Sequence, residues 1–154
     1  MALMSLSLFV YGSLRPDHNN YDQLSEWVLD SRSLSWPGHL RLRPEGYPAL
    51  TLPSDWPVLQ ALPYDWSAPA EPVPATPAWP GAVAGEILTL RDCPEMRRHL
   101  DDFEGFTPTL RDYLRVAVAW QGEWVWTYVA PEDRAEWPLI ERWPHQSGEI
   151  PPWR

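Results

Sequence analysis

The most regular apolar pattern near the start of the chain is a short run at residues 6–11, which ends at Gly12. Strand-forming residues fill this run and a turn residue follows at once, so the pattern predicts a buried β-strand. A polar loop comes next, after which Asn19 or Asn20 can cap a helix that continues to about Leu29. The three- and four-residue spacing of its apolar positions predicts that this helix buries Tyr21, Leu24, Trp27 and Val28.

Further strand patterns alternate with turn residues along the rest of the chain. They lie at residues 34–42 (interrupted at Pro37-Gly38), 49–52, 83–90, 113–120 and 123–129. The last two are separated by Gln121-Gly122, a two-residue connection that predicts a β-hairpin. A short element of undefined type is expected around residues 136–142.

A second helix is expected between the strand at residues 83–90 and the hairpin. Pro94 suits the first turn of this helix, which runs to about Phe103, and Gly105 is placed to end it in a left-handed cap. Strands therefore dominate, with two helices between them, and no internal repeat is visible. This order predicts an α+β fold, a small mixed β-barrel with flanking short helices.

Proline and tryptophan are unusually common, with 19 and 11 residues among 154. Eight of the prolines lie in residues 53–80, a stretch that can form neither a helix nor a central strand because proline lacks the backbone donor. Its three tryptophans predict that it packs on the rest of the protein as a surface excursion. We expect one domain over residues 1–154, with this excursion and a Trp/Pro-rich tail from about residue 131.

Charge and cysteine content exclude several classes of function. The net charge is −9 and no basic stripe occurs, which argues against nucleic-acid binding and against an anionic membrane surface. Cys93 is a single cysteine, so no internal disulfide marks an oxidising compartment. The apolar start lacks a basic leading region and a small-residue cleavage site, and no 18-residue apolar run occurs. We therefore expect a cytoplasmic protein.

The turn Tyr11-Gly12-Ser13-Leu14 is the first candidate site. A glycine at the end of a strand lets backbone N–H groups approach a ligand, and successive N–H groups form a concave donor set for an oxygen. The simpler alternative, equally weighted on this tetrapeptide alone, is that Gly12 only ends the strand. Ser13 lacks the Gly-x-Ser-x-Gly pattern of a nucleophile elbow, so the turn is not expected to supply a nucleophile.

Glu104 is the second candidate, at the end of the second predicted helix. Helical phase places Met96, Leu100 and Phe103 on one apolar stripe, with Glu104 at its edge and Asp101 and Asp102 turned away. Half-burial, the negative end of the helix and the nearby Asp101 all favour the neutral acid, so we expect a raised pKa for Glu104. Such a carboxyl group suits proton transfer near neutral pH. The alternative is a solvated helix end.

Tyr113 and Arg115 form a third, weaker candidate because strand alternation places them on one face, where they can line one pocket. By themselves they are more simply a strand aromatic and a rim charge. The histidines and the cysteine show no metal-ligand spacing, so no metal site is expected and these residues are read as scattered surface or loop positions. These residues are His18, His39, His99, His145 and Cys93.

Taken in order, these segments resemble the γ-glutamylcyclotransferase-like family, nearest to its γ-glutamylamine cyclotransferase and AIG2-like branch. The resemblance covers roughly residues 6–129 and rests on several short motifs. They are Phe9-Val10-Tyr11-Gly12-Ser13-Leu14-Arg15 followed by Asn19, Gly46-Tyr47-Pro48-Ala49-Leu50, Val83-Ala84-Gly85-Glu86-Ile87, Leu100-Asp101-Asp102-Phe103-Glu104-Gly105 and Tyr113-Leu114-Arg115-Val116. Residues 53–80 and the tail lie outside this set and put the substrate's identity in question more than the reaction type.

The resemblance implies a small β-barrel with no cofactor, in which Glu104 is the catalytic acid and base. It places the substrate-holding residues at Tyr11, Gly12, Ser13 and Leu14, and the family's Tyr-x-Arg at Tyr113 and Arg115. The implied reaction cyclises a γ-glutamyl amine or γ-glutamyl amino acid to 5-oxoproline and releases the amine. Two alternatives stay open: a non-catalytic ligand-binding or regulatory protein on the same fold, and an interaction platform formed by the Trp/Pro surface. The oligomeric state is not predicted.

Overall fold

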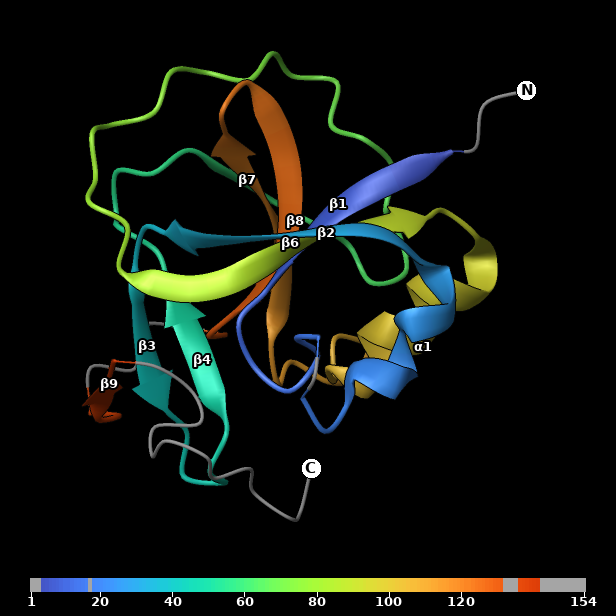
Figure 1. Cartoon of the computed structure of the whole chain (residues 1–154), viewed down its shortest axis with the longest axis horizontal. Coiled ribbons are helices and arrows are strands. Elements are labelled where there is room, and N and C mark those ends of the chain that lie inside the picture. Colours follow the sequence, from blue (N-terminus) through green and yellow to red (C-terminus); the bar gives the residue numbers. More distant parts are fainter. Residues whose placement is uncertain (1–3, 17, 132–135, 142–154) are drawn as a thin grey trace.

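Strands dominate the computed structural model, which describes residues 4–16, 18–131 and 136–141 (Figure 1). A six-stranded sheet has the order β2-β6-β1-β8-β7-β5, and a three-stranded sheet has the order β4-β3-β9. The strands are β1 Ser5–Val10, β2 Val28–Trp36, β3 His39–Leu42, β4 Pro48–Thr51, β5 Val58–Gln60, β6 Val83–Arg91, β7 Leu114–Trp120, β8 Glu123–Val129 and β9 Leu139–Ile140. The helices are η1 Tyr21–Gln23, η2 Ser25–Trp27 and α1 Pro94–Phe103.

The predicted first strand is confirmed as β1, which lies in the middle of the larger sheet. It pairs antiparallel with β6 along its whole length and parallel with β8 at Leu8 opposite Trp126. Leu8 and Val10 pack into one core cluster and Phe9 into the other, as alternation along a strand requires. Because β1 and β8 run parallel while β7 is antiparallel to β8, the C-terminal ends of β1 and β8 and the start of β7 meet at the same end of the sheet.

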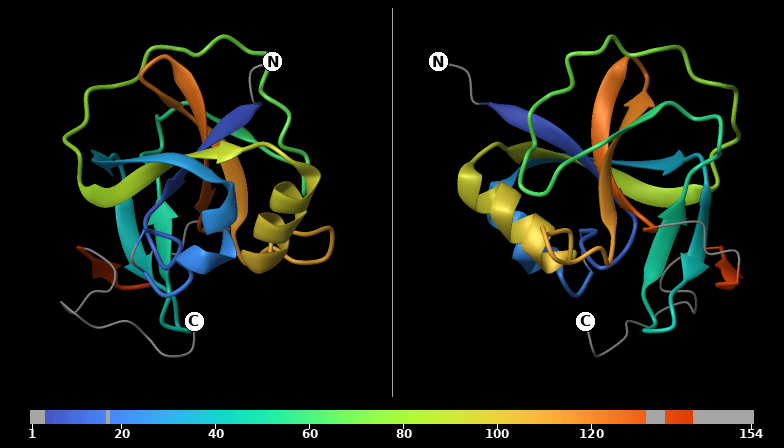
Figure 2. Two further views of the ribbon diagram at one scale, coloured as in Figure 1. Left: turned by 45° about the vertical axis from the view of Figure 1, so that its right-hand side comes forward. Right: turned by 180° about the vertical axis from the view of Figure 1, so that it is seen from behind.

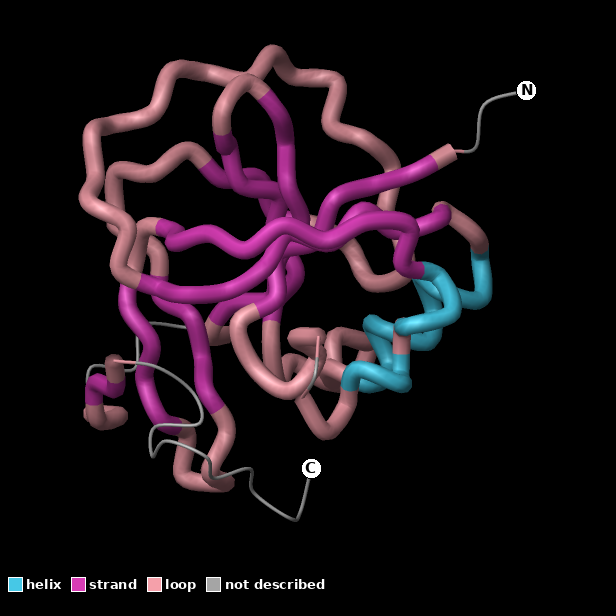
Figure 3. The backbone as a smooth tube through the Cα atoms, viewed as in Figure 1, coloured by secondary structure: helices cyan, strands magenta, loops and turns pink. Residues whose placement is uncertain are grey.

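The predicted hairpin and the second helix are also confirmed. Strands β7 and β8 pair with Trp120 opposite Glu123, and the turn residues Gln121 and Gly122 both have positive φ (48° and 81°), as a type I′ turn requires. Helix α1 begins at Pro94, as expected, and lies at one side of the sheet (Figure 3).

The helix predicted after Asn20 is wrong. Two short 3₁₀ helices, η1 and η2, replace it, and the side chain of Asn20 makes no cap hydrogen bond. Val28, expected inside the helix, is the first residue of β2 and pairs with Leu90. Pairing with β6 takes precedence over helix propagation here, although Leu24 and Trp27 are still buried as expected.

Barrel closure is not seen in the described residues, because β2 and β5 remain the two edges of the six-stranded sheet. The observed architecture is instead a mixed, sheet-dominated fold with few helices (Figures 1 and 3).

Residues 53–80 run over the sheet as a long connection that includes the edge strand β5 (Figure 2). Trp56 and Trp66 are buried, whereas Trp79 is 38% exposed. Of the tail, residues 132–135 and 142–154 lie outside the described residues, and β9 pairs with β3 in the part that is described. In the described parts of the chain, no helix has the length and apolar character that a membrane crossing requires.

Candidate active site

The turn after β1 contains backbone N–H donors without a partner among the described residues and lies at one end of the sheet. The N–H of Arg15 donates to the carbonyl of Gly12 (3.1 Å), which closes a tight turn over residues 12–15. Within the described residues, no hydrogen bond is made by the backbone N–H groups of Gly12, Ser13 and Leu14. Glycine is favoured at position 12 by a close approach and not by a positive φ, since a Cβ there would lie 3.1 Å from Cγ of Pro48.

Two contacts hold this turn in place. The Asn20 side chain donates to Ser13 Oγ (3.0 Å), and the backbone N–H of Asn20 donates to the Ser13 carbonyl (2.9 Å). Arg15 forms a two-point ion pair with Glu86 of β6, at 2.7 and 3.1 Å. A bidentate guanidinium–carboxylate pair fixes orientation as well as distance, so β6 anchors the turn.

Glu104 is the cap residue of helix α1. The N–H of Phe106 donates to the Asp101 carbonyl (2.8 Å) and that of Gly105 to the Asp102 carbonyl (3.2 Å), with Gly105 at φ +69°. These bonds form a Schellman motif, in which the left-handed residue just after the cap ends the helix. The predicted role of Gly105 is therefore confirmed. The side chain of Glu104 is 8% exposed, which makes it more buried than expected.

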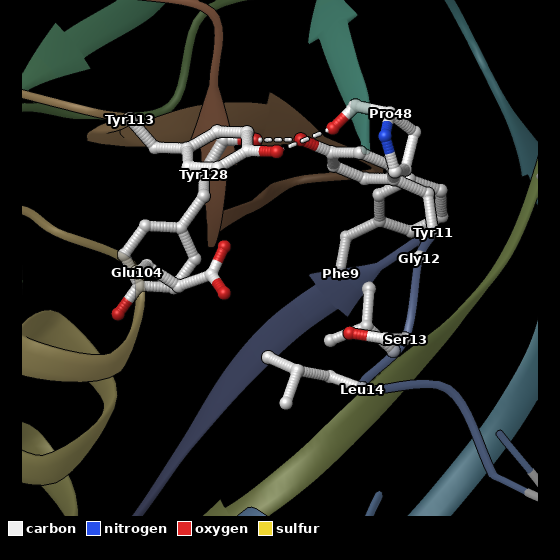
Figure 4. A pocket seen from close by; sticks show the side chains of 10 residues that line it. Phe9, Tyr11, Gly12, Ser13, Leu14, Pro48, Glu104, Tyr113 and Tyr128 are labelled. Carbon is white, nitrogen blue, oxygen red and sulfur yellow. Dashed lines mark hydrogen bonds between the residues drawn. The ribbon is translucent and has the colours of Figure 1, made fainter. Parts of the chain in front are cut away.

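The turn and Glu104 line one small pocket, about 360 Å³ including the space open to solvent. Its lining consists of Phe9, Val10, Tyr11, Gly12, Ser13, Leu14, Pro48, Glu104, Tyr113 and Tyr128. Figure 4 shows the Glu104 carboxylate turned toward the wall from which Ser13 and Leu14 project. Glu104 is the one charged side chain in this lining, so no Lys or Arg from the described residues faces a bound molecule.

The three tyrosines of the pocket direct their hydroxyl groups to protein acceptors. Tyr11 donates to the Tyr128 carbonyl (2.6 Å), Tyr113 to the Pro48 carbonyl (2.6 Å) and Tyr128 to the Asp101 carboxylate (2.8 Å). Figure 4 shows the first two of these bonds above the pocket. Burial, and then the negative charge of Asp101, raise the pKa of Tyr128 well above its ordinary value, so its phenol stays neutral.

The prediction that Arg115 lines a pocket with Tyr113 is wrong. Tyr113 lines the pocket, but Arg115 is absent from the described lining and is fully buried (0% exposed). Its Nε and Nη2 donate to the two Asp101 carboxylate oxygens (2.9 and 3.0 Å). A guanidinium beneath a pocket needs such a partner because burying an unpaired charge is costly.

Asp101 was expected to turn away from the core, yet it is also 0% exposed. Helical phase gives its direction relative to Leu100 but does not show that β7, β8 and residues 62–66 cover that side of the helix. Tyr128 was missed as well. The hairpin register places Tyr128 opposite Arg115, so the predicted two-residue turn carried a signal that could have found it.

No group of three or more His, Cys, Asp or Glu side chains among residues 4–16, 18–131 and 136–141 is arranged to hold a metal ion. The site is therefore built from one carboxyl group, aromatic walls and backbone donors.

Fold and pocket together define a small sheet-dominated protein with a small pocket at one end of its larger sheet. The chain belongs to the gamma-glutamyl cyclotransferase, AIG2-like family, which matches residues 8–145. Membership supports gamma-glutamyl cyclotransferase chemistry on a small molecule as the general type of function.

A solved structure supports the fold. The crystal structure of an AIG2-like protein from Mus musculus aligns with a TM-score of 0.51 at 22% identity, over 90% of this chain and 88% of the mouse chain. Comparison with curated proteins gives no significant match.

Proposed function

We propose that this protein cyclises a γ-glutamyl amine or γ-glutamyl amino acid to 5-oxoproline, with Glu104 as the general acid and base. The observation that carries the proposal is that Glu104 lines one pocket together with Gly12, Ser13 and Leu14, whose N–H groups make no hydrogen bond among the described residues. A γ-glutamyl compound has the complementary groups, because it carries an α-ammonium, an α-carboxylate and a γ-carbonyl oxygen.

Substrate binding follows from this complementarity. The N–H groups of Gly12, Ser13 and Leu14 donate hydrogen bonds to the α-carboxylate or carbonyl oxygen of the folded substrate, since they have no other acceptor among the described residues. The ammonium group then faces Glu104, the charged side chain of the lining. Holding the substrate folded brings its amine to its own γ-carbonyl, which makes the attack intramolecular.

Glu104 manages the proton. It removes one proton from the α-ammonium, and the freed amine forms a C–N bond to the γ-carbonyl carbon. The original amide C–N bond then breaks as Glu104 returns the proton to the leaving nitrogen. The new ring nitrogen loses its remaining extra proton to water, and the released amine takes one up from water, so protons balance.

The test is to incubate the protein with γ-glutamyl amines, γ-glutamyl amino acids and glutathione, and to measure 5-oxoproline. In Glu104→Gln the turnover rate should fall by about 10²- to 10⁴-fold, as expected for loss of a general acid–base group. Asp102→Asn is the matched control, because it removes one carboxylate from an exposed position two residues away. No turnover on any compound, or full activity in folded Glu104→Gln, contradicts the mechanism.

A further inference from the structure

Asp101, which contacts the pocket residue Tyr128, accepts hydrogen bonds from four residues in three parts of the chain. Its Oδ1 accepts from Arg115 of β7 (2.9 Å) and from the Tyr128 hydroxyl of β8 (2.8 Å). Its Oδ2 accepts from Arg115 again (3.0 Å), from the backbone N–H of Tyr64 (2.8 Å) and from Trp66 Nε1 (3.2 Å). One fully buried carboxylate thus joins helix α1, the β7–β8 hairpin and the proline-rich excursion.

Arg115 completes this connection from the other side. Its Nη2 also donates to the carbonyl groups of Leu62 (3.2 Å) and Asp65 (2.9 Å) in the excursion. Its guanidinium stacks on Trp66, 3.9 Å from the ring centre, and on Trp126 at 4.6 Å. The positive charge is therefore held by a carboxylate and by aromatic faces.

Tyr128 connects this buried network to both halves of the candidate site. Its hydroxyl donates to Asp101, whose own carbonyl accepts the Phe106 N–H that fixes Glu104 at the helix end. Its backbone carbonyl accepts the hydroxyl of Tyr11, which begins the donor turn. Its ring lines the pocket beside Glu104 (Figure 4).

We propose that Asp101 is a positioning residue for the cyclisation reaction, acting through Tyr128 and not on the substrate. The chain of contacts Asp101–Tyr128–Tyr11 sets the spacing between the proton-handling half and the donor half of the site. This inference rests on the proposed function. It also reassigns Arg115 from substrate binding to holding Asp101.

A role in stability alone explains the network less well. Buried ion pairs are often no more stabilising than well-packed apolar residues, and Arg115 Nη1 has no hydrogen-bond partner among the described residues. Tyr64 moreover adopts a left-handed conformation (φ 67°), which is unusual for a bulky residue, while its N–H donates to Asp101. Such strain persists only where the surroundings determine the geometry strongly.

A double-mutant cycle tests the proposal. Asp101→Asn and Tyr128→Phe should each lower kcat by about tenfold, with a smaller effect on KM. The kcat of the double variant should be about the same as that of either single variant, because both residues act through the same series of contacts. Asp102→Asn, with the same loss of charge on the adjacent exposed residue, should keep its activity. Multiplying losses in the double variant would overturn the proposal.

A second measurement does not depend on turnover. Amide hydrogen exchange in Asp101→Asn should rise in residues 9–14 and 104–106 as well as in residues 62–67, and Asp102→Asn should leave residues 9–14 unchanged. Exchange that rises only in residues 62–67 would overturn the positioning role of Asp101, whether or not the wild-type protein turns over a substrate. Absence of turnover in the wild type, by contrast, contradicts only the proposed function. If Asp101→Asn does not fold, the same measurement is made on Tyr128→Phe, in which amide hydrogen exchange in residues 9–14 should likewise rise.

Discussion

At the scale of single residues, Gly12 determines how closely the donor turn approaches the opposite wall. In Gly12→Ala the new Cβ would meet Cγ of Pro48 at 3.1 Å, so either Pro48 or the turn must shift by a few tenths of an ångström, and we expect the turn to take part of this shift. Displaced N–H groups bind the substrate oxygen less well, and we expect kcat/KM to fall by about tenfold, the loss typical of one weakened donor interaction. Adding Pro48→Ala removes the obstructing atom and should restore much of the activity; equal losses in both proteins would contradict this explanation.

Tyr128 gives a prediction about stability and pH. In the unfolded chain the phenol has an ordinary pKa of about 10, so it loses its proton above that pH. The raised pKa of Tyr128 means that the folded protein still keeps this proton there. The folded state therefore binds more protons above that pH, so its stability is complete below pH ~10 and falls as the pH rises further. Urea denaturation at pH 8 to 11 should show a shallower decline for Tyr128→Phe than for the wild type. Parallel declines would show that another group dominates this range.

At the scale of elements, the end of helix α1 determines where Glu104 lies. Gly105→Ala puts a side chain at φ +69° and brings its Cβ into steric overlap with the Asp112 side chain, so the Schellman motif cannot be kept unchanged. Gly122→Ala is a matched control, because it has a similar φ of +81° but open space around the new Cβ.

Backbone strain alone costs roughly 1 kcal/mol in both glycine variants. Gly105→Ala should lose about 2 kcal/mol or more in unfolding free energy, because steric overlap is added to the strain, and its kcat should fall. Gly122→Ala should lose stability only. Chemical denaturation and steady-state kinetics on the same preparations separate the two effects, and unchanged kcat in folded Gly105→Ala would contradict the role of the cap.

At the scale of the whole molecule, local signals predicted the parts of the site but not their surroundings. The glycine after β1 and the helical phase of Glu104 are read from neighbouring residues, and both residues line the pocket. The burial of Asp101 and the position of Arg115 depend on residues 62–66, far away in sequence, folding over helix α1. The failed helix after Asn20 has the same origin, since pairing of β2 with β6 is a long-range effect.

The net charge of −9 leads to a prediction that separates the two substrate classes of the proposed function. A γ-glutamyl amine with an uncharged leaving group has no net charge, whereas a γ-glutamyl amino acid carries one additional carboxylate. The described lining offers that carboxylate no Lys or Arg, and the field of the molecule repels it during approach. Salt screens this repulsion, because the Debye length falls from about 30 Å at 0.01 M to about 10 Å at 0.1 M. Over this range, kcat/KM for the γ-glutamyl amino acid should rise about twofold while that for the amine stays constant, and an equal response of both substrates would mean that the overall charge does not influence substrate choice.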